Sequence, residues 1–236
     1  MGMLQALGAR FLNAENQSLG YGGEQLIHTA HIDLSQLDSR LARVQIEVAC
    51  DVNNPLCGET GASAVFGPQK GATVQMVQQL DAALAHFAEK VQQQLGINIA
   101  NQSGAGAAGG MGGGLLLLPK VRLKKGVNIV LETLNFSVQV QDADLVITGE
   151  GRMDGQSAYG KTPIGVAKTA KQFGKPVIAI VGCLREDYEV VYEQGIDAVF
   201  PIIRQLDSLE NTLRSGKENL ISTAQNIARF YQLAMK

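Results

Sequence analysis

Charged and hydroxyl side chains gather in one short, glycine-punctuated segment of the chain. Its members are Gly149, Glu150, Arg152, Asp154, Ser157 and Lys161. Carboxylates suit Mg²⁺, whereas guanidinium and ammonium groups suit phosphoryl oxygens. The segment is therefore a candidate site for phosphate and a divalent cation, with Glu150 and Asp154 as the metal ligands. A solvated charged loop is the alternative interpretation.

Part of this segment, residues 155–162, fits the phosphate-loop pattern G-x-x-x-x-G-K-[ST]. Two features argue against a genuine phosphate loop. Six residues, 149–154, separate its first glycine from the end of the predicted strand, and Pro163 removes an amide donor directly after Thr162. Lys161 can still bind an anion near a helix start, where backbone amides and the helix dipole favour negative charge. A phosphate-loop-like nucleotide-binding module stays open as an alternative.

A glycine run at residues 104–114 is the second candidate site. It holds seven glycines in eleven positions, more than a turn needs. We interpret it as a cradle of backbone amides for phosphate or carboxylate. The glycines expected to contact the anion are Gly106, Gly109, Gly110 and Gly112. A flexible structural turn is the alternative.

Asp51 and Asn53 follow a predicted strand, in a loop that also contains Pro55. An Asp at such a position can act as general base for a substrate hydroxyl or as a magnesium ligand. Asn53 beside it is a candidate for binding the substrate. Ordinary turn chemistry next to a proline is the alternative.

Hydrophobic periodicity predicts the elements that position these residues. In the first half, apolar residues at helical spacing run from Met3 to Phe11, a strand covers 44–50, and a long helix covers 74–95 and ends at Gly96. In the second half, strands and helices alternate, which implies a parallel sheet covered on both faces. The predicted strands there are 145–148, 177–181 and 198–202, and the predicted helices are 163–173, 187–194 and 208–235, the last broken near 215–216. Ligands of such sheets bind beyond the carboxyl ends of the strands.

The composition fits a folded α/β protein and argues against several other classes. Of 236 residues, 45% are hydrophobic and 18% charged, and 20 basic and 22 acidic residues leave a net charge of −2. This balance argues against a nucleic-acid or membrane surface, and the apolar N-terminal stretch is neither a signal peptide nor a membrane span. The three cysteines are too few and too widely spaced for a disulfide framework, so we expect a cytoplasmic protein.

Six motifs stand in order along nearly the whole chain. They are ACDVNNPL at 49–56, GASAVFGPQKG at 61–71, GAGAAGGMGG at 104–113, VITGEGRMD at 146–154, GKTPIGV at 160–166 and GIDAVF at 195–200. Together they resemble the bacterial glycerate kinases. The resemblance implies an ATP- and Mg²⁺-dependent transfer of phosphate to D-glycerate, giving a phosphoglycerate.

The resemblance also implies how the chain is organised. Residues 1–143 would be an inserted α/β domain, and residues 144–236 the C-terminal half of a Rossmann-like parallel-sheet domain. Within that arrangement, Asp51, Arg152 and Lys161 are the catalytic candidates, and D-glycerate and a nucleotide are the ligands.

The beginning of the chain departs from the family pattern. Family members usually carry a further segment ahead of the residue that matches Met1, and no capping residue precedes the helical spacing at Met3. We therefore expect upstream sequence and part of the parallel sheet to be missing. A non-catalytic fragment, stable as a homodimer through an exposed strand edge, is the rival hypothesis.

Overall fold

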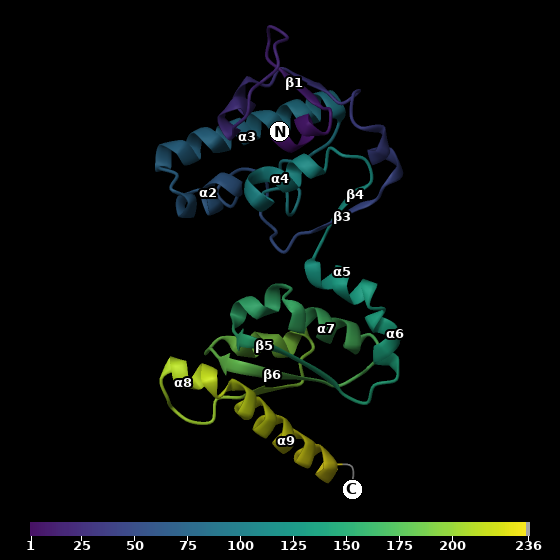
Figure 1. The fold of residues 1–236 in the computed structure, drawn as a ribbon, viewed down its shortest axis with the longest axis vertical. Helices are drawn as coiled ribbons and strands as arrows, with labels where there is room; N and C mark the ends of the chain where they lie inside the picture. Colours follow the sequence, from purple (N-terminus) through teal and green to yellow (C-terminus); the bar gives the residue numbers. More distant parts are fainter. Residues whose placement is uncertain (235–236) are drawn as a thin grey trace. The chain divides into compact units, whose positions relative to one another are not determined.

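The computed structural model describes residues 1–234, and the chain divides into two compact units, Met1–Gly126 and Val127–Lys236 (Figure 1). Each unit has its own hydrophobic core, and the α/β class is confirmed. The predicted domain boundary follows residue 143, whereas residues 127–143 belong to the second compact unit, in which α6 (Phe136–Gln141) contacts α7 (Thr162–Lys171). The assignment of the two parts to an inserted and a Rossmann-like domain stays a prediction.

The first unit combines two small sheets with four helices among the residues described. Its helices are α1 (Gly2–Ala6), α2 (Ala62–Phe66), α3 (Val74–Leu95) and α4 (Ala107–Leu115), with 3-10 helices at Gly23–His28, Ser39–Arg43 and Pro68–Lys70. Its strands are β1 (Arg10–Leu12), β2 (His31–Asp33), β3 (Ile46–Ala49) and β4 (Val121–Lys124). β1 and β2 are antiparallel, and β3 and β4 are parallel. Strand β4 was not predicted, because its alternation of Val121 and Leu123 with two basic residues covers only four positions.

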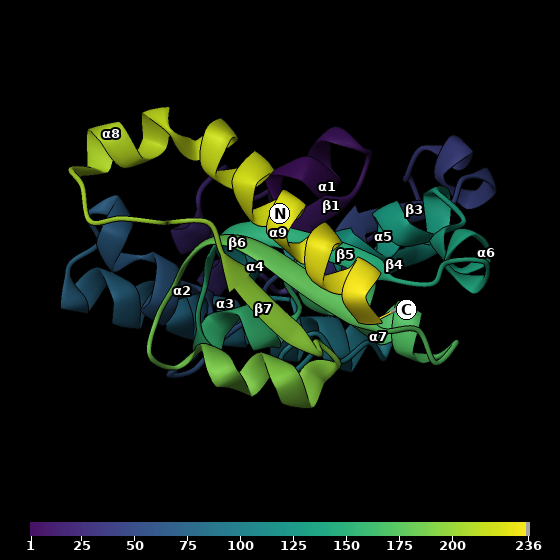
Figure 2. The ribbon, with the colours of Figure 1, turned by 90° about the horizontal axis from the view of Figure 1, so that it is seen from below.

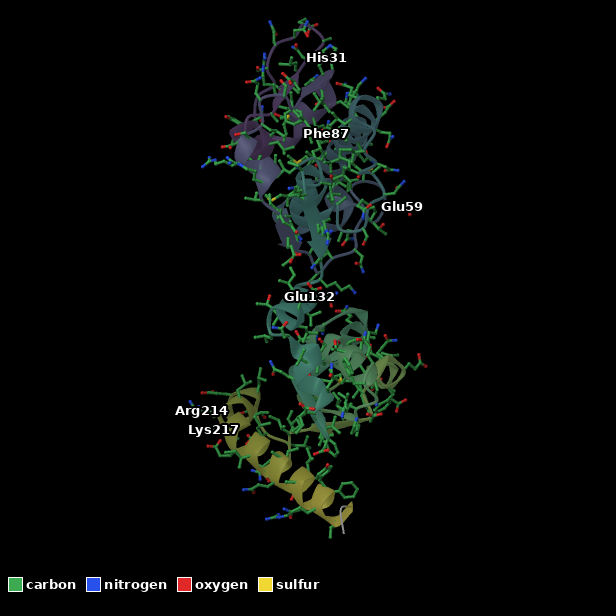
Figure 3. The ribbon with its side chains drawn as sticks, turned by 90° about the vertical axis from the view of Figure 1, so that its right-hand side faces the viewer. His31, Glu59, Phe87, Glu132, Arg214 and Lys217 are labelled. Carbon is green, nitrogen blue, oxygen red and sulfur yellow. The ribbon has the colours of Figure 1, made fainter. Side chains whose placement is uncertain are left out.

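The long helix α3 is confirmed with the predicted bounds. The Thr73 side chain caps its start by accepting from the Met76 amide, and Gly96 ends it in the left-handed conformation. Its apolar face is buried in the core, where the ring of Phe87 lies 5.7 Å from that of Phe11. Figure 3 shows Phe87 among the side chains that fill this unit.

The predicted N-terminal helix is wrong beyond its first turns. α1 ends at Ala6, and Phe11 lies on strand β1. Gly8 separates the two elements with φ of +103°, and a Cβ on Gly8 would lie 2.1 Å from the carbonyl oxygen of Gln36. The apolar spacing therefore comes from two elements that pack into one core, not from one helix face.

The second unit is built around a parallel sheet with strand order β5-β6-β7. The strands are β5 (Val146–Met153), β6 (Val177–Leu184) and β7 (Ala198–Pro201), and the helices are α5 (Gly126–Thr133), α6, α7, α8 (Leu209–Arg214) and α9 (Gly216–Ala234). Helices α7 and α9 cover opposite faces of this sheet (Figures 1 and 2). The predicted break near 215–216 is confirmed, while the segment Tyr188–Gln194 is a 3-10 helix and not the expected α-helix. The predicted end of the last helix, residue 235, lies outside the described residues.

Strand β5 is longer than predicted. The prediction stopped at Thr148, but pairing with β6 continues through Arg152↔Cys183 and Met153↔Leu184. A Cβ on Gly149 would lie 2.2 Å from the carbonyl oxygen of Ile180, so the strands approach closely where glycine stands. Backbone pairing needs no apolar side chains. The strand predicted from the hydrophobic pattern therefore ends before the paired strand does.

Candidate active site

The charged segment begins on the last residues of β5 and turns directly into a 3-10 helix, Gly155–Tyr159. Asp154 is the N-cap of this helix. Its backbone amide donates to Ser157 Oγ at 3.1 Å, and its side chain accepts a hydrogen bond in return, which makes a reciprocal capping box. The cap fixes both side chains at the carboxyl end of a parallel strand, where ligands of such sheets bind.

Two carboxylates converge on the Ser157 hydroxyl. Ser157 Oγ lies 2.5 Å from Glu150 Oε1 and 3.4 Å from Asp154 Oδ1. Ser157 is buried, and the Asp154 side chain is only 5% exposed. One buried and one partly buried carboxylate around a single hydroxyl are a poor match for a solvated charged loop, because buried charge is retained only where partners compensate it.

Two cations flank these carboxylates. Lys161 Nζ lies 3.4 Å from Asp154 Oδ1, 3.3 Å from Ser157 Oγ and 3.8 Å from Glu150 Oε2. Arg152 Nε lies 3.3 Å from Asp154 Oδ2, with 57% of its side chain exposed. The Lys161 side chain is 42% exposed. Because both cations are accessible to solvent, each can contact a ligand that binds at the surface of the turn.

The charges of this cluster affect its most buried carboxyl. Burial acts to raise the pKa of Asp154, but the Coulombic attraction and hydrogen bond of Lys161, the charge of Arg152 and the hydrogen bond with Ser157 together hold that pKa below its usual range. Asp154 is therefore an anion at neutral pH, suited to accept hydrogen bonds or bind a cation.

Residues 155–162, which fit the phosphate-loop pattern, have a different structure from the one expected. The gap of six residues between strand and first glycine is wrong, because β5 reaches Met153 and leaves only Asp154 before Gly155. Residues 155–159 nevertheless form a tight 3-10 helix, in which the Ser157 amide donates to the Asp154 carbonyl. Lys161 contacts protein carboxylates instead of facing an open backbone loop.

The glycine run of the first unit forms most of α4. Gly106 and Gly112 have packing reasons, since a Cβ would lie 2.2 Å from the Pro55 carbonyl oxygen and 2.1 Å from that of Gly104, respectively. The helix is interrupted at residues 108–110, whose φ angles are 51°, 73° and 95°. Ala108 costs about 1–2 kcal/mol in this left-handed region, and such strain often marks functional sites. The exposed backbone at Gly109 is thus the part of the run that is open to a ligand.

Asp51 and Asn53 lie just beyond β3, also in the first unit. Asp51 Oδ1 accepts from the Gly126 amide at 2.8 Å and so holds the start of α5. Asn53 Oδ1 accepts from Ser103 Oγ at 3.3 Å. Both side chains are partly or fully accessible, and the chain holds them in a different unit from Arg152 and Lys161.

Sequence reasoning passed over a pocket in the first unit. Polar side chains that line it include Lys70 and Gln79. Lys70 belongs to the 61–71 motif, and the three glycines of this motif are the sequence feature that could have indicated a binding site. Gln79 is one of several polar residues on an amphipathic helix, and no pattern distinguishes it from its neighbours.

Within residues 1–234, no group of three or more His, Cys, Asp or Glu side chains is placed to hold a metal ion by itself. None of the helices in that same range has the length and apolar character needed to cross a membrane.

The fold and this cluster define an α/β protein with a turn of charged side chains at the end of a parallel strand. The chain belongs to the glycerate kinase family, whose family model matches residues 1–232. A glycerate kinase of Haemophilus influenzae is 66% identical over 229 residues, which are 97% of this chain and 61% of that protein. The glycerate 2-kinase of Escherichia coli K12 is 46% identical over 235 residues, covering 100% of this chain and 62% of the relative.

A solved structure agrees with these relatives. It is a crystal structure from Salmonella typhimurium LT2 whose protein is provisionally described as glycerate kinase 2, with a TM-score of 0.81 and 46% identity. The match covers 99% of this chain and 61% of that one. The chain thus spans about three fifths of the length of the proteins it matches.

Proposed function

We propose that the protein to which this chain belongs transfers the γ-phosphate of ATP to D-glycerate, giving a phosphoglycerate. The cluster of Glu150, Asp154, Ser157 and Lys161 at the end of β5 is the observation that carries the proposal. Phosphoryl transfer is catalysed mainly by positioning and by neutralising charge on the transferred group. Family membership and relatives named glycerate kinase support this choice of reaction.

In this proposal the two cations neutralise phosphoryl or substrate carboxylate charge. Lys161 is already positioned by Asp154 and Ser157, so its ammonium group needs little ordering. Arg152 is more exposed and can present its planar fork to a phosphate or carboxylate. Gly149 is exposed and completes the surface that faces the substrate. Ser157 is buried, so in place of a direct substrate contact it positions Glu150 and Lys161 through its hydroxyl.

Glu150 and Asp154 would hold Mg²⁺ there. Their oxygens fit the cation, because Mg²⁺ uses one or two carboxylates together with phosphate oxygens and water, and both approach the same hydroxyl. When bound, Mg²⁺ supplies charge neutralisation for the phosphates. The depressed pKa of Asp154 keeps that carboxylate ionised for this role.

In the first unit, we assign Asp51 the role of positioning the glycerate hydroxyl and Asn53 that of a substrate contact. In the glycine run, the exposed Gly109 and the neighbouring Gly110 provide backbone near an anionic group of the substrate or nucleotide. The predicted contacts of Gly106 and Gly112 are withdrawn, because both residues are buried where the backbone packs closely. The strained, exposed turn at 108–110 supports this assignment.

The free edge of β5 supports a proposal about partners. In the described residues β5 pairs only with β6, and Ile147 on β5 is 56% exposed. Helix α9 also exposes Phe230 and Leu233, at 71% and 69%. We propose that a further strand-bearing segment or a second copy of the chain covers this surface.

We also place the protein in the cytoplasm. The three cysteines, Cys50, Cys57 and Cys183, are free thiols in the structure, as expected in a reducing compartment.

A coupled assay for ADP release with D-glycerate tests the reaction directly. We expect turnover that requires both D-glycerate and Mg²⁺, and a Lys161→Met variant that loses about 10²–10³-fold in kcat, as when one stabilising donor is removed. A Lys168→Met variant on the exposed side of α7 is the matched control and should keep its activity. ADP release that is independent of D-glycerate would contradict the proposal.

A further inference from the structure

A pocket of about 430 Å³ opens in the first unit between α2, α3 and the 3-10 helix Gly23–His28. This volume lies within the range of roughly 300–1,000 Å³ typical of small-molecule sites. Its walls are largely apolar, with side chains from Leu26, Phe66, Met76, Leu80 and Leu84. Such walls suit a ligand with an apolar or aromatic body.

The pocket is narrow on one side and open on another. A Cβ added to Gly23 would lie 2.9 Å from Leu80 Cδ2, so backbone and side chain approach closely there. A Cβ on Gly109 would meet nothing within 4 Å, although Gly109 lines the same pocket. A flat group can therefore enter beside the left-handed turn and lie between these walls.

Four polar side chains, Glu24, Ser63, Lys70 and Gln79, line this apolar pocket. Among residues 1–234, the side chains of Glu24, Lys70 and Gln79 form neither a hydrogen bond nor an ion pair, so each is available to a ligand. Their chemistry differs: one carboxylate, one ammonium and one amide that can donate and accept together.

These three groups match the three parts of an adenine nucleotide. An amide side chain pairs with the donor and acceptor on one edge of adenine, a carboxylate accepts from ribose hydroxyls, and an ammonium group binds phosphate. The apolar walls suit the faces of the base. We propose that this pocket binds the adenosine part of the nucleotide, with Gln79 at the base, Glu24 at the ribose and Lys70 at the phosphates. The inference rests on the proposed kinase function and deepens it.

Calorimetric titration of the full chain with adenosine and with ADP tests this division of roles. Gln79→Ala should weaken both ligands about tenfold, because a hydrogen-bonded pair to the base is lost in each. Lys70→Ala should weaken ADP about tenfold and leave adenosine unchanged, since adenosine carries no phosphate. Gln78→Ala, on the neighbouring exposed position of α3 and outside the pocket, is the matched control and should bind both ligands normally.

The two proposals fail in different ways. Wild-type ADP affinity in both Gln79→Ala and Lys70→Ala, or no binding of ADP to the chain, would overturn the pocket assignment. The proposed reaction would survive the first of these results if ADP release still required D-glycerate. The expected binding pattern without D-glycerate-dependent turnover would support the pocket and contradict the reaction.

Discussion

The candidate site of the second unit consists of side chains, whereas that of the first unit consists mainly of backbone. In the second unit, charged side chains converge on Ser157 at the end of a regular strand. In the first unit, three consecutive residues with left-handed backbone, 108–110, form the exposed turn of the candidate site. A side-chain site depends on which residues stand at a strand end, whereas a backbone site depends on how closely segments approach each other.

Two phenylalanines, one in each unit, also differ in burial. Phe87 in the first unit is 3% exposed and contacts Phe11, whereas Phe230 on α9 is 71% exposed. Phe87 therefore belongs to the buried core of the first unit, whereas α9 of the second unit presents apolar side chains that another segment or molecule can cover.

The largest expected effect tests this difference in burial. Phe87→Ala should lower the free energy of unfolding by about 3–5 kcal/mol, because it leaves a cavity in a closed core. Phe230→Ala should change it by less than about 0.5 kcal/mol in the chain alone, as for an exposed position. Urea denaturation of both variants measures the contrast, and equal losses would show that α9 is covered in solution.

A smaller effect tests the backbone-built site. Gly112→Ala should cost about 3 kcal/mol, because the new Cβ would overlap the Gly104 carbonyl oxygen at 2.1 Å. Gly109→Ala should cost about 1 kcal/mol, since it adds left-handed strain but meets no neighbouring atom. Thermal or urea unfolding separates the two values. If Gly109→Ala proved the more damaging, the turn at 108–110 would be packed and not open.

The smallest effect tests the electrostatics of the side-chain site. The pKa of Asp154 is depressed in the folded protein, so its stabilising contribution is complete above the unfolded pKa of about 3.9 and is lost as pH falls through the folded value. Asp154→Asn should therefore show a shallower loss of stability on acidification below about pH 4. Urea midpoints measured across this interval give the slopes, and parallel curves would mean that Lys161 and Arg152 do not stabilise the ionised carboxylate.

Much of the fold follows from the sequence where side-chain pattern and element coincide. Helix α3 has a cap at Thr73, an apolar face and a stop at Gly96, and all three are visible in the residues. Strand β5 is visible only as far as Thr148, since beyond it glycines and charges follow and pairing with β6 depends on backbone alone. The spacing at Met3 and Phe11 misleads because two elements share one core.

The candidate site divides in the same way. The charged turn around Asp154 is predictable, because its residue types stand together in the sequence after a strand. The pocket with Lys70 and Gln79 is not, since its walls come from segments far apart in the chain and its polar members resemble ordinary surface residues. A pattern of residue types along the sequence does not show which distant segments lie close together in the fold.

The central claim is that the turn after β5 handles the phosphoryl group. Its most direct test compares kcat/KM for D-glycerate in Arg152→Ala and Lys168→Ala, two surface cations in the same unit, only one of which contacts Asp154. We expect a loss of about 10²-fold or more for Arg152→Ala and a near-normal value for Lys168→Ala. Equal values for the two variants would contradict the assignment of the site.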